Sequence, residues 1–123
     1  MRTDNQILNE SKRFALCIIK LYTYLKEEKQ IYVLSKQLLR CGTSIGANVR
    51  ESINAQSRMD FINKLNIALK EANETEYWLE LLHESDLLDD TQFKSIYDDC
   101  GKIAATLTKI IKTTKNVSDN NGQ

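Results

Sequence analysis

The sequence predicts an all-α protein, an antiparallel up-down-up-down four-helix bundle with a left-handed supercoil. The 123 residues contain no proline and only four glycines, so few positions interrupt a helix. In four separate segments, apolar and small residues recur every three or four positions. A mean step of about 3.5 residues is typical of helices that wrap around one another. Four such helices joined by short loops form a four-helix bundle.

Each segment carries one apolar stripe that we expect to face the core. The stripes are Ile7, Ser11, Phe14, Ile18, Leu21 and Leu25; Leu34, Leu38, Cys41, Ile45, Val49 and Ser52; Phe61, Leu65, Ala68, Ala72, Thr75, Leu79 and Leu82; and Ile96, Cys100, Ile103, Leu107, Ile110 and Thr114.

The first two helices are expected from about Asn5 to Glu28 and from about Tyr32 to Ala55, with the polar segment KEEKQ as the first loop. The second helix contains Gly42 and Gly46, one turn apart. This spacing indicates either the close approach of another backbone or a kink.

The third helix is expected to begin at Ser57, whose side chain can cap the helix together with Asp60, and to end near Glu84. Because the connections are short, neighbouring helices should run antiparallel.

The fourth helix is expected from about Thr91 to Lys115, with Asp89 or Asp90 as its N-cap and Gln92 placed for a reciprocal bond to Asp89. We therefore expect one domain over residues 1–115 and a disordered polar tail over residues 116–123.

The composition predicts a cytoplasmic protein that neither crosses a membrane nor carries a secretion signal. Its apolar runs are far shorter than the roughly 20 residues that span a bilayer, and its first residues lack an apolar core. The three cysteines, Cys17, Cys41 and Cys100, are odd in number and widely separated. This pattern favours small buried residues over a disulfide framework or a zinc site.

The net charge is zero but unevenly distributed. Residues 1–57 carry nine basic and five acidic side chains, residues 58–90 carry three and nine, and residues 91–123 carry five and three. The third helix is therefore acidic beside basic neighbours, which indicates charge matching within or between subunits.

The residues that metal or hydrolytic chemistry requires are scarce. His83 is the single histidine, and one Glu80-x-x-His83 pair stands where a di-iron bundle uses two. His83 is therefore interpreted as a solvated helix-end residue, without a cofactor. Glu71 and Glu74 are assigned to a solvated acidic face. No nucleophile–base arrangement accompanies them, so we expect neither an enzyme nor a small-molecule substrate.

A polar stripe flanks the apolar stripe of the second helix, and Glu76 lies at the edge of the third helix's stripe. We expect a buried hydrogen-bond network that fixes helix register. The alternative interpretation is a ligand or catalytic pocket around Glu76. The expected network comprises Gln37, Arg40, Ser44, Asn48 and Glu76.

Apolar residues of the first and third helices lie off the stripes, among them Ile19, Tyr24, Ile62 and Leu69. They predict a subunit interface, because a monomer rarely exposes tryptophan beside aliphatic neighbours. The alternative is a wide core face in an irregular bundle. The predicted interface residues are Tyr22, Ile67, Trp78 and Leu81.

A nucleic-acid interface on the first two helices is a further hypothesis, although lysines on amphipathic helices are commonly just solvated. Its candidate contacts are Lys12, Arg13, Lys20, Lys36 and Arg40.

The segments Gln37–Ser52 and Ser57–Leu82 resemble the bacterial four helix bundle protein family, which was first met in 23S rRNA intervening sequences. The resemblance covers about residues 7–113, with departures at Cys41 and Ser52. The matching residues are Gln37, Leu38, Arg40, Ser44, Ile45, Asn48, Glu51, Phe61, Ala68 and Glu76.

The resemblance implies a non-enzymatic bundle that assembles as a ring-like or barrel-like homopentamer, acting as a scaffold or accessory factor in a ribonucleoprotein or retroelement-like context. The accessory variability proteins of diversity-generating retroelements are similar in fold, and they bind a reverse transcriptase and nucleic acid through a basic surface. RNA, DNA or a nucleic-acid enzyme are therefore implied partners, although the neutral charge of this chain weakens that implication.

Overall fold

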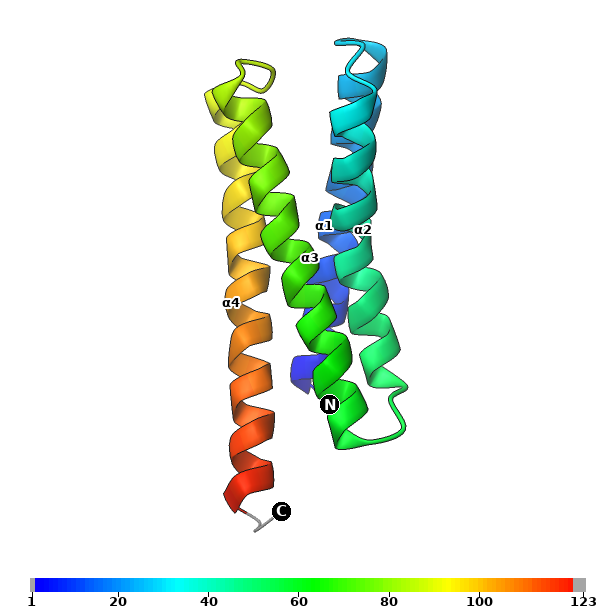
Figure 1. Ribbon diagram of the computed structural model, residues 1–123, viewed down its shortest axis with the longest axis vertical. Coiled ribbons are helices and arrows are strands. Elements are labelled where there is room, and N and C mark those ends of the chain that lie inside the picture. Colours follow the sequence, from blue (N-terminus) through cyan, green and yellow to red (C-terminus); the bar gives the residue numbers. More distant parts are fainter. Residues whose placement is uncertain (1, 121–123) are drawn as a thin grey trace.

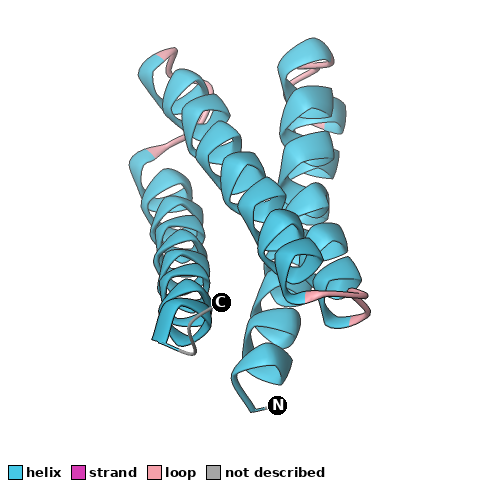
Figure 2. Cartoon of the chain, turned by 60° about the horizontal axis from the view of Figure 1, so that its bottom comes forward, coloured by secondary structure: helices cyan, strands magenta, loops and turns pink. Residues whose placement is uncertain are grey.

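The computed structural model describes residues 2–120 and the side chains of residues 5–117. Four helices make up the described part of the chain, which contains no strand: α1 (Arg2–Glu27), α2 (Val33–Ile53), α3 (Arg58–Glu84) and α4 (Asp90–Asn120). Figures 1 and 2 show them side by side and alternating in direction. The prediction of an all-α antiparallel four-helix bundle is confirmed. No helix within these residues combines the length and apolarity that a membrane span requires.

Helices that follow one another along the chain pack together. Within the described residues, α2 packs on α1 and α3, α4 packs closely on α3 and least on α1, and no Cα atoms of the diagonal pairs lie within 8 Å of each other. The four predicted stripes form the core. Of their 25 positions, all are buried except Leu21, Leu34, Phe61 and Thr114, which are half-buried. Ser35, Leu88 and Ile111 are further buried residues outside those stripes.

Side-chain caps fix the starts of α3 and α4. The Asp60 amide donates to Ser57 Oγ at 3.0 Å, as predicted for the third helix. The Gln92 amide donates to Asp89 Oδ1 at 2.7 Å, and the Asp89 amide donates back to Gln92 Oε1 at 3.4 Å. Asp89 rather than Asp90 is thus the cap, and the reciprocal bond at Gln92 is confirmed.

Two predicted boundaries are wrong. Helix α1 begins at Arg2, three residues before the predicted start, and α4 continues through Asn120 instead of ending at Lys115. Residues 116–120, which the sequence analysis assigned to the tail, are therefore part of α4, while residues 121–123 lie outside the described part. The tail is polar, but residues 116–120 include neither proline nor glycine, so nothing in them interrupts the helix.

Gly42 and Gly46 bring the backbones of α1 and α2 together. A Cβ on Gly42 would lie 2.8 Å from Ile18 Cγ1, and one on Gly46 would lie 3.3 Å from the Ser11 carbonyl oxygen. Of the two interpretations of this glycine pair, close approach is the one that the structure confirms.

This geometry predicts opposite effects for two glycine substitutions. Gly42→Ala gains roughly 1 kcal/mol of helix propensity but forces Ile18, which is fully buried, out of its position, so the free energy of unfolding should fall by about 1 kcal/mol or more. At Gly101 a Cβ would make only an ordinary 3.8 Å contact with Glu76, so Gly101→Ala is the matched control and should be stabilising. Urea unfolding measures both. A Gly42→Ala protein as stable as the Gly101→Ala protein would contradict the close approach.

Candidate functional site

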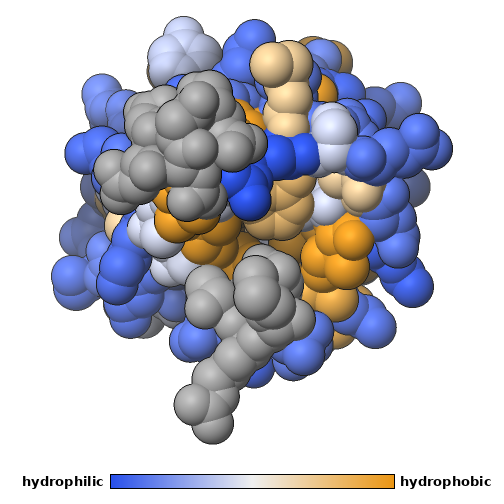
Figure 3. Space-filling model, turned by 90° about the horizontal axis from the view of Figure 1, so that it is seen from below, coloured by the Kyte–Doolittle hydropathy of each residue, from blue (hydrophilic) through white to orange (hydrophobic). Residues whose placement is uncertain are grey.

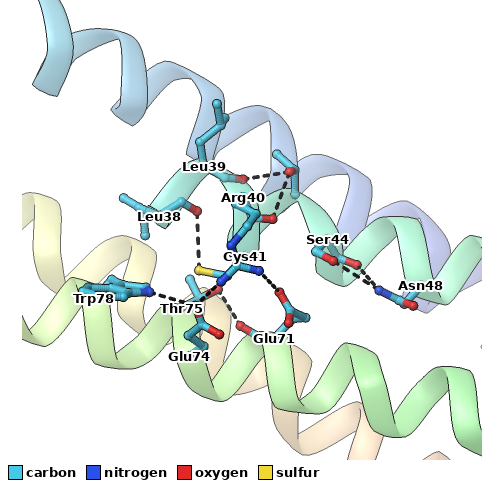
Figure 4. A network of polar contacts seen from close by, with 11 residues as sticks. Leu38, Leu39, Arg40, Cys41, Ser44, Asn48, Glu71, Glu74, Thr75 and Trp78 are labelled. Carbon is cyan, nitrogen blue, oxygen red and sulfur yellow. Dashed lines mark hydrogen bonds and ion pairs between the residues drawn. The ribbon is translucent and has the colours of Figure 1, made fainter. Parts of the chain in front are cut away.

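A polar cluster joins α2 to α3 and centres on Arg40 (Figure 4). Arg40 Nη1 donates to Glu71 Oε2 at 3.1 Å, and Nη2 contacts Glu74 Oε2. The same Glu74 oxygen accepts from Trp78 Nε1 at 3.1 Å. One guanidinium thus holds two carboxylates of the adjacent helix, and one of these carboxylates fixes the Trp78 ring.

Beneath this cluster, the side chains between α2 and α3 are buried from solvent. Thr75 is fully buried, and its hydroxyl donates to the Glu71 carbonyl at 2.7 Å. Cys41 is also fully buried, and its thiol donates to the Leu38 carbonyl at 3.6 Å. Burial raises the pKa of Cys41. A buried thiol with a raised pKa is a poor nucleophile.

The predicted network is only partly assembled. Asn48 Nδ2 donates to the Ser44 carbonyl at 2.9 Å and to Ser44 Oγ at 3.2 Å, a contact within one helix. Gln37 is exposed. The prediction that Arg40, Ser44 and Asn48 partner Glu76 is wrong, and so is the assignment of Glu71 and Glu74 to a merely solvated face, since both bind Arg40.

Glu76 lies on the opposite flank of α3, against α4. Its Oε2 atom is 3.8 Å from the Cβ position of Gly101, on α4. At 100° per residue, Glu76 and Glu74 are 200° apart, so only one of them can face α2. Partial burial, followed by repulsion from Glu80, raises the pKa of Glu76.

Two further contacts occupy the α3–α4 interface, and both were missed from the sequence. The Tyr97 hydroxyl donates to Glu80 Oε2 at 2.7 Å, and this bond with partial desolvation raises the pKa of Tyr97 to about 12. The buried Cys100 thiol donates to the Ala72 carbonyl at 3.4 Å, and desolvation raises its pKa. A signal for the first contact was available, because Glu80 continues the Glu76 face by one turn.

His83 joins the end of α3 to the start of α4. Its Nε2 atom is 2.7 Å from Asp90 Oδ1, and its ring stacks on Phe93 with centroids 4.1 Å apart. It is therefore packed on one side and not simply solvated. Among the described residues no group of three histidine, cysteine or acidic side chains is placed to hold a metal ion.

The predicted interface residues differ in exposure. Ile67 is exposed, whereas Tyr22, Trp78 and Leu81 are half-buried. The Tyr22 ring lies 5.8 Å from the Lys26 ammonium. Leu16 and Ile19 on α1 and Tyr77 on α3 are further exposed apolar residues.

Lys12, Arg13, Lys20 and Lys36, four of the five predicted nucleic-acid contacts, are exposed on α1 and α2. Arg40 is engaged by two carboxylates, which reduces its attraction for phosphate.

Two open polar clefts lie at the ends of the bundle. One, of about 500 Å³, is lined by residues of the α2–α3 turn, including Glu51, Ser57 and Lys64. The other, of about 350 Å³, is lined by residues of the two turns at the opposite end, including Tyr24 and His83. Neither resembles the enclosed, mostly apolar pocket that binds small molecules.

Comparison with known proteins identifies a family and similar solved structures. Residues 3–109 match the family of 23S rRNA-intervening sequence proteins. A crystal structure of a protein with unknown function from the S23 ribosomal protein family of Bacteroides thetaiotaomicron VPI-5482 is 55% identical. The match covers 89% of this chain and 98% of that chain, with a TM-score of 0.88. No curated protein matches.

The Arg40 cluster predicts a measurable contribution to stability. Arg40→Met leaves Glu71 and Glu74 facing each other without a cation, so the free energy of unfolding should fall by about 1 kcal/mol, and by less at high salt. Arg40→Lys keeps the charge but loses the forked geometry, so its effect should be intermediate. Urea unfolding at two salt concentrations measures this. Equal stability of the three proteins at low salt would show that the cluster contributes nothing.

The raised pKa of Glu76 predicts a pH dependence of stability. Because the folded state binds this proton more readily than the unfolded state, the charged carboxylate costs stability at neutral pH, and the cost disappears as pH falls through the raised pKa. Glu76→Gln should therefore raise the melting temperature near pH 7 and converge with the parent protein in acid. Glu84→Gln, at an exposed position on the same helix, is the control. A lowered melting temperature for Glu76→Gln at neutral pH would contradict this assignment.

Proposed function

The chain belongs to the family of 23S rRNA-intervening sequence proteins, and from its exposed apolar surface we propose that it is a non-enzymatic, self-assembling scaffold. Family membership establishes the fold but assigns no activity, because the similar solved protein is itself of unknown function. The proposal therefore rests on the chain's own surface.

The observation that carries the proposal is the apolar content of the outer faces of α1 and α3. Leu16 is 54% exposed and Ile19 is 44% exposed on α1, while Ile67 is 42% exposed and Tyr77 is 54% exposed on α3. Trp78 and Leu81 extend the α3 face as half-buried residues. Large apolar side chains grouped on an outer helix face favour burial against another protein surface.

The Arg40 cluster supports this use of the α3 face. Trp78 is anchored through its indole nitrogen to Glu74, and Glu74 is held by Arg40. A large aromatic side chain fixed before association loses little conformational entropy on binding, which is typical of interface anchors. The cluster thus prepares the apolar face for contact and provides no catalytic group.

The assembly that the family resemblance implies is a homopentamer, a particle five times the chain mass of 14.2 kDa. We place it in the cytoplasm, where the buried free thiols of Cys41 and Cys100 stay reduced. Its role would be that of an accessory factor for a ribonucleoprotein or a nucleic-acid enzyme.

A charge on the α3 face should break the assembly. Ile67→Glu places a carboxylate at an exposed position that the folded subunit tolerates but an apolar interface does not. Trp78→Glu should act in the same way and more strongly. Light scattering should show the mass falling toward 14.2 kDa, with helix content by circular dichroism retained.

The matched control is Ala105→Glu, an exposed position facing outward on α4, which should leave the mass unchanged. If the parent protein is itself a 14.2 kDa monomer at micromolar concentration, the scaffold proposal is wrong. If it binds RNA with an affinity that falls as salt rises, the nucleic-acid hypothesis takes its place.

A further inference from the structure

The two ends of the bundle carry opposite charge, although the chain as a whole is neutral. The antiparallel arrangement places the α2–α3 turn, the start of α1 and the end of α4 at one end, and the α1–α2 and α3–α4 turns at the other (Figure 1). Charges that are separated along the sequence are thereby gathered in space.

The basic end comprises the charged residues at the level of the α2–α3 turn. Among the described side chains of residues 5–10, 50–64 and 109–117, it has six cationic against three anionic ones, a net charge of +3. They are Arg50, Arg58, Lys64, Lys109, Lys112 and Lys115, with Glu10, Glu51 and Asp60. One of these cations, Lys64, is 3.5 Å from Glu51 Oε1.

The acidic end comprises the charged residues of segments 26–29 and 84–90, which form the other two turns and the helix ends that enter them. It has six anionic side chains against two cationic ones, a net charge of −4, and all eight are exposed. They are Glu27, Glu28, Glu84, Asp86, Asp89 and Asp90, with Lys26 and Lys29. Both lysine ammonium groups lie near aromatic rings, 5.8 Å from Tyr22 and 6.0 Å from Tyr24.

Both ends also expose apolar side chains. At the basic end Met59 is 73% exposed, and Ile53 and Val117 are exposed to a lesser degree. Figure 3 views this end and shows apolar residues between polar ones. At the acidic end Val33 is 74% exposed and Tyr32 is 53% exposed.

We propose that the basic end of one copy docks on the acidic end of a second copy, so that bundles associate along their long axes. The two ends are nearly equal and opposite in charge, and every copy carries both. Opposite potentials on two surfaces steer their encounter and fix which surface meets which.

A second copy fits the basic end better than a nucleic acid does. Phosphate groups would satisfy the cations, but they would leave Met59 and Ile53 without an apolar partner. The acidic end of another copy offers carboxylates together with Val33 and Tyr32. It therefore matches both the charge and the apolar character of the surface.

This contact joins two different surfaces, so the first and last copies of a row each keep one unpaired end. Further copies can therefore be added to the row. It is distinct from the lateral contact proposed for the α1 and α3 faces and does not depend on it. Because the axial contact is mainly electrostatic and small in area, it should be weak and sensitive to salt, whereas a lateral apolar contact should persist in salt.

Sedimentation at low and high salt tests the proposal. Between about 20 mM and about 500 mM salt, the salt-sensitive part of self-association should weaken at least tenfold. The basic-end variant Lys109→Glu, Lys112→Glu, Lys115→Glu has two acidic ends. The acidic-end variant Glu27→Lys, Glu28→Lys, Glu84→Lys has two basic ends. Each variant alone should lose the salt-sensitive association at low salt, and an equimolar mixture of the two should regain it.

Single reversals on α4 provide the matched control. Lys112→Glu at the basic end should weaken the association, while Lys102→Glu, exposed at mid-length, should not. Recovery in the mixture cannot arise from a folding defect, because it requires both variants to be folded. If the parent protein shows no salt-sensitive association, or if the mixture fails to recover it, the axial contact is wrong. Binding of a single-stranded oligonucleotide that is lost in the basic-end variant, without salt-sensitive self-association in the parent, would assign this end to nucleic acid.

Discussion

The close approach of α1 and α2 at Gly42 and Gly46 determines how α2 is rotated, and the position of the polar cluster follows from that rotation. With both glycines turned toward α1, Arg40, Ser44 and Asn48 lie on the opposite flank. That flank faces α3, where Arg40 reaches Glu71 and Glu74. A residue with a side chain at position 42 would push against Ile18 and disturb this orientation, because packed interiors tolerate extra volume poorly.

The inward direction of each helix was predictable from the sequence, because burial follows the stripes residue by residue. What the stripes could not give is the handedness of the bundle. An up-down bundle can place α3 on either side of the α1–α2 pair. In one arrangement a given flank of α3 packs against α2, and in the other arrangement the same flank packs against α4. Glu71 and Glu76 lie on opposite flanks of α3, so assigning Glu76 to Arg40 amounted to choosing the wrong flank. The sequence shows that Glu71, Glu74 and Trp78 share one face of α3, but it does not show which helix packs against that face.

The end of α4 was missed for a different reason. Polar composition predicts exposure, which residues 115–117 show, but it does not by itself predict disorder. Residues 116–120 continue a helix that is already formed, and extending a helix costs far less than nucleating one. Caps, in contrast, were predictable at Ser57 and Asp89, since each depends on residues only three positions apart.

The interior is satisfied in its hydrogen bonds, and the proposed assembly depends on the surfaces. Among the described side chains, no buried nitrogen or oxygen atom lacks a partner, and both buried thiols have raised pKa values. The surface is organised in two directions. Apolar residues lie along the sides, on α1 and α3, and opposite charges lie at the two ends. Lateral neighbours that run parallel would bring like-charged ends together, whereas neighbours that run antiparallel or follow one another along the axis would pair opposite ends. A ring of parallel bundles would concentrate positive charge on one rim and negative charge on the other, and a second ring could then dock on it through the same axial contact.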